Sequence, residues 1–298
     1  MRKIFAVLLY IVLMMGFTGC TTRPSGESAS QGQPRIVCTS AALCEVLAQL
    51  DLDLAGVPDT SMELPERYRD VPRVGLPMTP DLEIIKSLKT TDVLSPNSLQ
   101  YDLKPKYESI NVPCTFVNLM SVEGMFKSIE DLGKKYQKTR EADTLIADYQ
   151  AFMNGYNAKI EGRESPRVLI LMGIPGAYMV ATERSYVGNL VKLAGGSNVF
   201  EDDGALLNIN TEVIAETDPD IILRAAHGLP DEVQKMFAKE FEENDIWKHF
   251  RAVQNKRVYD LDFKTFNMSA SLGYKEGLNK LFEMFYGQGS ASDEENTD

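Results

Sequence analysis

The chain has 298 residues, 44% hydrophobic and 25% charged, which is the balance of a globular protein with one large or two ordinary domains. Its net charge of −12 argues against nucleic acid as a partner, because phosphate backbones repel an acidic chain. Two histidines are too few for a three-histidine metal site, and the sequence has neither a phosphate-binding P-loop nor the Gly-x-Ser-x-Gly motif of a hydrolase.

The first residues predict an export signal. Arg2 and Lys3 precede an apolar run of about 12 residues, which is too short to span a bilayer as a permanent helix. Small residues then precede Cys20, a pattern similar to the lipobox of bacterial lipoproteins, in which this cysteine carries the acyl chains. We therefore expect a signal peptide over 1–19 and a lipid anchor at Cys20. The alternative is an ordinary secretory signal with a chance cysteine.

Two segments have the composition of flexible chain. Residues 20–34 are rich in Ser, Gly, Pro and Gln, which predicts a tether that lets the body reach a membrane partner. Residues 287–298 are acidic and polar, which predicts a disordered tail. Together with the anchor, they predict an extracytoplasmic protein held at the outer face of the cell membrane.

Over residues 35–138, short β-rich runs alternate with helical patterns, which favours an N-terminal α/β lobe with an open, mainly parallel sheet. Strands are expected at 35–38, 54–56, 92–94 and 115–117. Helices are expected at 41–50, 80–88, 103–110 and 122–136.

A helix from Arg140 to about Ile160 has no strand partner, so we expect a connecting helix over 139–164, about 30 Å long. The alternation restarts over 165–286, which predicts a C-terminal α/β lobe. Its strands are expected at 167–172, 178–181, 221–224 and 258–261. Its helices are expected at 186–194, 211–216, 231–239 and 274–285.

The pattern as a whole predicts an α/β protein with two lobes, each built on a parallel sheet, joined by one long helix. Open parallel sheets bind ligands beyond the carboxyl ends of their strands. Two such lobes can present these ends to each other, so a ligand cleft is expected between them.

Two residues stand where that cleft is expected. His227 follows the strand at 221–224, and from its position alone a surface histidine is an equally good interpretation. Met78 lies in a loop stiffened by Pro77 and Pro80, although a loop methionine more often packs than binds a ligand.

Polar groups allow further interpretations. The Thr39–Ser40 pair precedes the first helix, where it forms either an ordinary N-cap or an anion site, and Thr60–Ser61 on the next loop could assist. Glu83 and Glu212 stand early in two helices, one in each lobe, where the helix dipole also favours acids.

The cysteines other than Cys20 give no metal-binding signal. Cys38, Cys44 and Cys114 are odd in number, so they cannot all pair, and none has Cys-x-x-Cys spacing. We expect them to be small buried hydrophobic residues.

Four segments carry a resemblance to a known family: DVPRVGLPMTPD at 70–81, the stretch at 166–197, LRAAHGLPDEVQKMFAKEFE at 223–242 and NDIWKHFRAVQNKRVYDLD at 244–262. Through them the body resembles the class III, or cluster A, substrate-binding proteins of ABC importers, which have two Rossmann-like lobes joined by a single long helix, and among these the heme receptor lipoproteins. The resemblance implies a monomeric, non-enzymatic receptor whose transported ligand is heme b, iron protoporphyrin IX. It also implies two protein partners, an ABC permease in the cytoplasmic membrane and an upstream heme-donor surface protein.

The same resemblance assigns roles to residues. Met78 in GLPM and His227 in RAAHG fall on the axial ligands of the heme iron, and a thioether with an imidazole is a sound ligand pair for heme. Glu83 and Glu212 fall on the glutamates by which the class docks on arginine pockets of its permease. The heme propionates would be bound at Ala41, Ala42, Thr60 and Ser61.

This chain departs from the pattern in two places. The loop at 59–62 lacks the basic or aromatic residues expected beside the propionates, and the stretch at 263–271 is divergent. An iron–siderophore or cobalamin receptor of the same fold is the first alternative; it would need arginine and aromatic residues in place of axial ligands. A secreted lipoprotein enzyme or adhesin is the second, and neither a catalytic constellation nor repeats favour it.

Overall fold

The computed structural model of the chain describes residues 33–287. The predicted signal peptide over 1–19, the lipidation site Cys20, nearly all of the tether over 20–34 and the tail after Gly287 lie outside the described residues. Within the part that is described, no helix is both long enough and apolar enough to cross a membrane.

The first sheet has four parallel strands in the order β2-β1-β5-β6. The chain passes from β1 to β2 on one side of β1 and later returns to β5 on its other side, so the strand order reverses between β1 and β5. The strands are β1 Ile36–Cys38, β2 Leu54–Gly56, β5 Asp92–Pro96 and β6 Cys114–Val117. The helical elements of this part are α2 Ala41–Gln49, η1 Glu66–Tyr68, α3 Leu82–Ser87, η2 Asn97–Leu99, α4 Gln100–Ser109 and α5 Val122–Lys135.

The second sheet follows the order β10-β8-β7-β11-β12, with β9 paired to β7. Its long central pair, β7 and β11, runs parallel over six residues of β11. The strands are β7 Arg167–Ile174, β8 Ala177–Ala181, β9 Ser197–Asn198, β10 Leu206–Leu207, β11 Ile221–Ala226 and β12 Val258–Asp260. The helical elements are α7 Tyr186–Leu193, α8 Thr211–Ala215, α9 Pro230–Glu243, η3 Asp245–His249, α10 Arg251–Gln254 and α11 Tyr274–Tyr286.

The second sheet is mixed, which corrects the expectation of a parallel sheet in this half of the chain. β8 runs antiparallel to β7, and β10 runs antiparallel to β8. Only Pro175 and Gly176 connect β7 to β8, and a two-residue connection can join antiparallel strands but not parallel ones. Gly176 has a φ of +83°, a conformation that glycine adopts without a steric cost.

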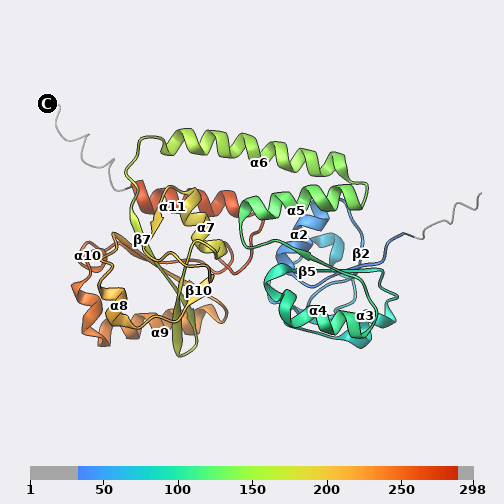
Figure 1. The fold of residues 1–298 in the computed structure, drawn as a ribbon, viewed down its shortest axis with the longest axis horizontal. Coiled ribbons are helices and arrows are strands. Elements are labelled where there is room, and N and C mark those ends of the chain that lie inside the picture. The colour runs from blue at the N-terminus through green and yellow to red at the C-terminus, as the bar shows by residue number, and fades with distance from the viewer. Residues whose placement is uncertain (1–32, 288–298) are drawn as a thin grey trace, which may run out of the picture. The chain divides into compact units, whose positions relative to one another are not determined.

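Helix α6, Thr139–Ile160, lies beside α5 and packs against α11 (Figure 1). Phe126 of α5 stacks on Tyr149 of α6 with 4.2 Å between ring centroids, and Tyr274 of α11 packs edge-on against both rings. The Tyr156 hydroxyl donates to the Leu278 carbonyl at 2.7 Å. α6 occupies the predicted connecting segment 139–164; the exact lobe boundaries stay a prediction.

Direct hydrogen bonds also join the two halves of the described chain. Asn189 of α7 accepts from the Val122 amide at 2.9 Å and donates to the Glu123 carboxylate at 3.0 Å. The Ala270 amide donates to the Leu119 carbonyl at 2.7 Å. One buried hydrophobic cluster includes residues from both sheets and from α5, α6 and α11, so the halves share a core.

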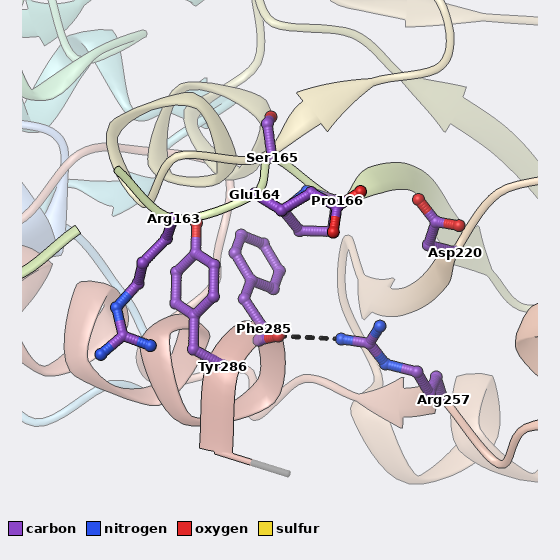
Figure 2. Close-up of a pocket in the computed structure, with 8 residues that line it drawn as sticks. All are labelled: Arg163, Glu164, Ser165, Pro166, Asp220, Arg257, Phe285 and Tyr286. Atoms are coloured by element: carbon purple, nitrogen blue, oxygen red, sulfur yellow. Dashed lines mark hydrogen bonds between the residues drawn. The ribbon is translucent and has the colours of Figure 1, made fainter. Parts of the chain in front are cut away.

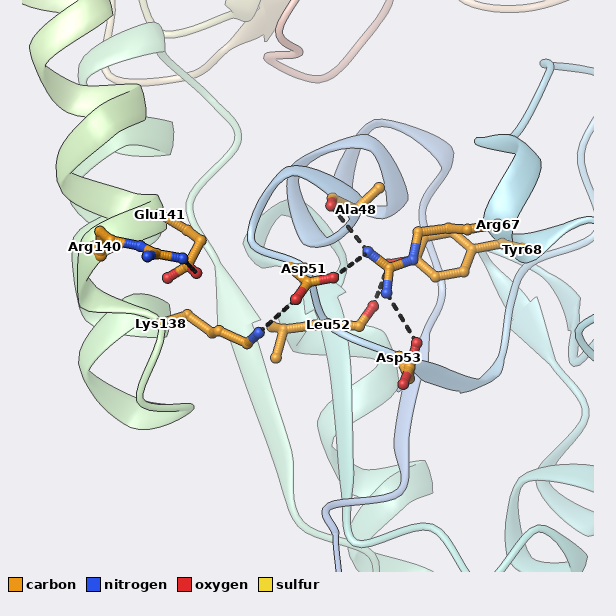
Figure 3. A network of polar contacts seen from close by, with 9 residues as sticks. All are labelled: Ala48, Asp51, Leu52, Asp53, Arg67, Tyr68, Lys138, Arg140 and Glu141. Atoms are coloured by element: carbon orange, nitrogen blue, oxygen red, sulfur yellow. Dashed lines mark hydrogen bonds and ion pairs between the residues drawn. The ribbon is translucent and has the colours of Figure 1, made fainter.

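Charged residues fix the C-terminal end of α2 (Figure 3). Arg67 donates to the Ala48 carbonyl at 3.2 Å and pairs with Asp51 at 3.0 Å and Asp53 at 2.9 Å. Lys138, directly before α6, reaches the other carboxylate oxygen of Asp51 at 2.9 Å. These contacts, first Lys138 and then Arg67, lower the pKa of Asp51. The network anchors α2 at the end opposite to its first turn, which belongs to the candidate site.

Candidate functional site

The first candidate position is the turn between β1 and α2, at the carboxyl edge of the first sheet. The Thr39 amide donates to the Leu94 carbonyl at 3.1 Å, and the Thr39 and Ser95 hydroxyls lie 2.6 Å apart. Thr39 directly follows β1, and Ser95 is the last residue but one of β5; the strand order reverses between these two strands. Such a switch point is where open α/β sheets bind ligands.

Helix α2 begins at this switch point. Ser40 is its N-cap in an extended conformation, and its side chain makes no capping hydrogen bond. The first amides of a helix have no partner within the helix, so those of Ala41 and Ala42 are available to an acceptor. Both alanine side chains are buried, which leaves the backbone as the part of these residues that can bind a ligand.

The predicted loop residues Thr60 and Ser61 follow β2 on the same edge of the sheet. The Thr60 hydroxyl accepts from the Met62 amide at 3.0 Å, which shapes the loop as a local turn. The preceding Asp59 amide donates to the Gly75 carbonyl at 2.8 Å. This bond joins the loop to the segment that carries Met78.

Met78 lies at the tip of a short hairpin formed by β3, Gly75–Leu76, and β4, Thr79–Pro80. The predicted helix starts two residues later than expected, at Leu82, because Asp81 is the N-cap and accepts from two amides of α3. Gly75 has a φ of +87°, and a Cβ there would meet the Asp81 amide nitrogen at 2.9 Å, so this turn requires glycine. The Met78 side chain is 60% exposed.

His227 directly follows β11, on the second sheet. Its amide donates to the Gly173 carbonyl of β7 at 2.9 Å. His227 therefore lies between β7 and β11, the pair of strands at which the strand order of the second sheet reverses. Leu229 then takes a left-handed φ of +48° before α9 begins. This conformation is uncommon for a leucine and fixes the course of the loop between His227 and α9.

Exposed apolar side chains flank both predicted axial ligands. Leu76 on the Met78 hairpin is 57% exposed, and Leu229, two residues after His227, is 60% exposed. Met78 itself is 60% exposed, so each of the two candidate positions presents an exposed apolar side chain beside the predicted ligand. Leu76 and Leu229 were not predicted from the sequence, because both lie in loop segments whose sequence gives no sign of which side chains are exposed.

The structure therefore brings together some of the predicted site residues and leaves others apart. One hydrogen bond, from the Asp59 amide, joins the Thr60–Ser61 loop to the Met78 hairpin, and the first turn of α2 lies at the same edge of the sheet. His227 lies at the matching edge of the other sheet. Among the described residues, no hydrogen bond links the Met78 hairpin to the His227 loop.

A strong ion pair stiffens the strand that leads to His227. The Arg224 guanidinium binds both carboxylate oxygens of Asp260, at 2.7 and 2.6 Å, across β11 and β12. It also lies over the ring of Phe241, 4.8 Å from its centroid. A bidentate pair of this kind fixes its partners in one geometry.

Burial contributes to raising the pKa values of two side chains on α2, Cys44 and Glu45. The pKa of the Cys44 thiol is raised well above its usual value by its contact with the Cys38 thiol and by burial, and the charge of Arg73 acts in the opposite direction. Burial likewise raises the pKa of Glu45, against the opposing charge of Lys264. Cys38 and Cys44 are buried as predicted, whereas Cys114 is only half-buried.

The predicted docking residues Glu83 and Glu212 lie in closely similar settings. Each is the exposed second residue of a short helix, Glu83 in α3 and Glu212 in α8. The N-caps Asp81 and Asn210 both bind first-turn amides through their side chains. Neither glutamate makes an ion pair with another described residue, so both carboxylates are available to a partner.

A cavity of about 480 Å³ lies away from the candidate site residues (Figure 2). It is lined by Pro166 and Asp220, which directly precede β7 and β11, so it lies at the amino ends of these strands. Arg257 lines it too and donates to the Phe285 carbonyl at 3.0 Å. The cavity therefore belongs to the edge of the sheet opposite to His227. The described residues contain no cluster of three or more metal-ligating side chains.

Comparison with known proteins places this arrangement in a family. The family model described as periplasmic binding protein matches residues 36–265, which includes both sheets and every candidate site residue of the described chain. The chain belongs to this family.

Individual proteins similar to this periplasmic binding protein support the same family assignment. The high-affinity heme uptake system protein IsdE of Staphylococcus aureus (strain Newman) is 42% identical over 292 residues, 96% of this chain and 99% of the relative. A crystal structure of S. aureus IsdE complexed with heme has a TM-score of 0.82 and 43% identity, covering 86% of this chain and all of that one. An ABC transporter substrate-binding protein from Listeria monocytogenes EGD-e has a TM-score of 0.82 and 47% identity with the same coverage.

These similarities confirm the class and the two-lobed α/β fold predicted from the sequence. The relatives are substrate-binding proteins of transport systems. The periplasmic binding protein described here is accordingly a binding protein and not an enzyme.

Proposed function

We propose that this chain is the extracytoplasmic heme receptor of an ABC importer, and that it holds the iron of heme b between Met78 and His227. The observation that carries the proposal is its 43% identity to S. aureus IsdE complexed with heme, over the whole length of that chain. The local chemistry is compatible with it. Thioether sulfur and imidazole nitrogen are both heme-iron ligands, and Met78 and His227 are both exposed.

The surroundings of the two residues support a large, flat, apolar ligand that carries acidic groups. Leu76 and Leu229 offer apolar contact to a macrocycle. The first amides of α2, at Ala41 and Ala42, and the loop of Thr60 and Ser61 offer hydrogen-bond donors to carboxylates. In this proposal heme is the transported ligand, not a resident cofactor.

Delivery and location complete the proposal. Glu83 and Glu212 would dock on the permease in the cytoplasmic membrane, and a surface protein would supply the heme. The acylated Cys20 would hold the monomeric receptor at the outer face of the membrane, and the tether over 20–34 would let it reach the permease. Both glutamates are exposed and form no ion pair with another described residue, which supports the docking role.

Titration of the purified protein with hemin tests the ligand. We expect a sharp Soret band of a low-spin iron with two axial ligands. Met78→Ala and His227→Ala should each remove one ligand, shift this band and weaken binding at least about tenfold. His249→Ala is the matched control, because His249 is exposed and lies at the end of η3.

The outcomes separate the alternatives. Unchanged spectra in both ligand variants would show that the axial assignment is wrong. The absence of a Soret change in the unaltered protein, together with binding of a ferric siderophore or of cobalamin, would replace heme by that ligand.

A further inference from the structure

Arg73 is placed beside the candidate site by contacts far apart in sequence. It pairs in a parallel bridge with Val57, directly after β2, and the bridge is flanked by hydrogen bonds at 3.0 and 2.9 Å. Its guanidinium donates to the Pro58 carbonyl at 3.0 Å. Arg73 therefore lies between the loop of Thr60 and the hairpin of Met78, which starts two residues later.

The positive charge of Arg73 is not neutralised by an ion pair within the described chain. Arg67 and Arg69, on the same segment, each pair with carboxylates. Arg73 forms no ion pair with any described residue, although the chain contains 43 acidic residues. Arg73 is exposed, so the remaining N–H groups of its guanidinium are available to an anion from solution.

The first turn of α2 has a second unused polar group. Ser40 is 7% exposed, and its hydroxyl makes no hydrogen bond with another described residue. It stands beside the unpaired amides of Ala41 and Ala42, where the helix dipole favours negative charge. The charge of Arg73 is felt at Cys44, in this same turn, where it opposes the rise of the thiol pKa.

We propose that Arg73, together with the Ser40 hydroxyl and the first amides of α2, binds the carboxylates of the ligand, which are the propionates if the ligand is heme. This inference rests on the proposed function. The loop at 59–62 has no basic residue that could pair with a propionate. In this proposal Arg73, on the neighbouring segment, supplies the positive charge instead. Arginine suits the role because its planar fork matches a carboxylate.

Hemin and its dimethyl ester distinguish this role from a structural one, because the ester has the same macrocycle and iron but no carboxylates. We expect Arg73→Gln to weaken hemin binding about tenfold, the usual effect of losing a charge-assisted hydrogen bond. The Soret band should keep its position, since the iron ligands are untouched. The affinity for the ester should be the same in Arg73→Gln and in the unaltered protein. Arg73→Lys should recover part of the hemin affinity.

Arg69→Gln is the matched control, because Arg69 is exposed and already paired with Glu66. Equal hemin affinity of Arg73→Gln and the unaltered protein would overturn the inference. An equal loss for hemin and its ester would also overturn it, since it would show that Arg73 only holds the loop at Pro58 in place. If the unaltered protein failed to bind hemin at all, the heme assignment itself would fall and this inference with it.

Discussion

Cys114 begins β6 and lies half-buried near Asp92. Burial, with a further contribution from the Asp92 charge, raises the pKa of its thiol from 9.0 to about 12. The folded protein therefore favours the neutral thiol more than the unfolded chain does. The resulting stabilisation is fully present below pH 9 and is lost as the pH rises toward 12, because the unfolded chain releases its proton first.

Replacing Cys114 by Ser tests this at the level of one atom, since a serine hydroxyl does not ionise in this range. We expect the urea midpoint of the unaltered protein to fall more steeply between pH 9 and pH 11 than that of the variant. Near pH 7 the two midpoints should depend on pH in the same way. Parallel alkaline losses in both proteins would assign the effect to other groups, such as the buried tyrosines.

Single residues of the site were predictable to different degrees. Met78 and His227 could be located from their neighbours, because prolines and a strand end mark loops at the edge of a sheet. The role proposed for Arg73 could not be predicted, since it depends on a bridge to Val57, sixteen residues earlier in the chain. The exposure of Leu76 and Leu229 is also a tertiary property, which the sequence of a loop does not contain.

At the scale of elements, Asp92 links β5 to the end of α5. It is the first residue of β5 and is 5% exposed. Its carboxylate accepts from the Tyr136 hydroxyl and from Lys135, and from Thr115 of β6 at 3.3 Å. Burial, followed by the bond to Asp92, raises the pKa of Tyr136. A buried carboxylate with several donors leaves all of them unsatisfied when it is removed.

We therefore expect Asp92→Ala to lower the free energy of unfolding by about 2–3 kcal/mol, measured by urea denaturation with an unchanged m-value. Asp131→Ala is the control; this side chain is 60% exposed and pairs with Lys127 along α5, so its loss should cost less than about 0.5 kcal/mol. Similar losses for both variants would show that the Asp92 contacts add nothing beyond a surface ion pair.

The elements with a clear repeat were predictable. The helix expected at 41–50 is α2, Ala41–Gln49, and the strand expected at 221–224 is β11, which continues to Ala226. The two-residue strands of the Met78 hairpin are too short to show any periodicity. The segment of η3 and α10 was missed for another reason: the aromatic stack of Phe241, Trp247 and Phe250 holds it in place, so tertiary packing rather than a local pattern determines it.

At the scale of the whole molecule, the proposed transport role separates ligand binding from docking. Glu83 and Glu212 lie on helices of different halves of the chain, α3 and α8, and neither helix contributes a predicted heme contact. Surface carboxylates that pair with arginines of a partner affect association without changing a distant ligand site.

Cells that carry Glu83→Ala together with Glu212→Ala should lose at least about tenfold in heme uptake, since two ion pairs with the permease are removed. The purified variant should bind hemin as the unaltered protein does. The control pair is Asp143→Ala with Glu161→Ala, two exposed acids at either end of α6. Unimpaired uptake would reject docking through these glutamates, and lost hemin binding would place them in the ligand site instead.

The two proposed iron ligands lie on loops of different sheets, and this has a consequence for the release of the ligand. In the proposed mode the receptor acts as a chelator whose two arms, Met78 and His227, belong to separate lobes and share no hydrogen bond. The second arm binds at an effective concentration set by how rigidly α6 and the Asn189 contacts hold the lobes. A permease that moved the lobes slightly apart would turn a bidentate complex into a monodentate one. The affinity difference between the unaltered protein and its single-ligand variants measures how much binding would then be given up.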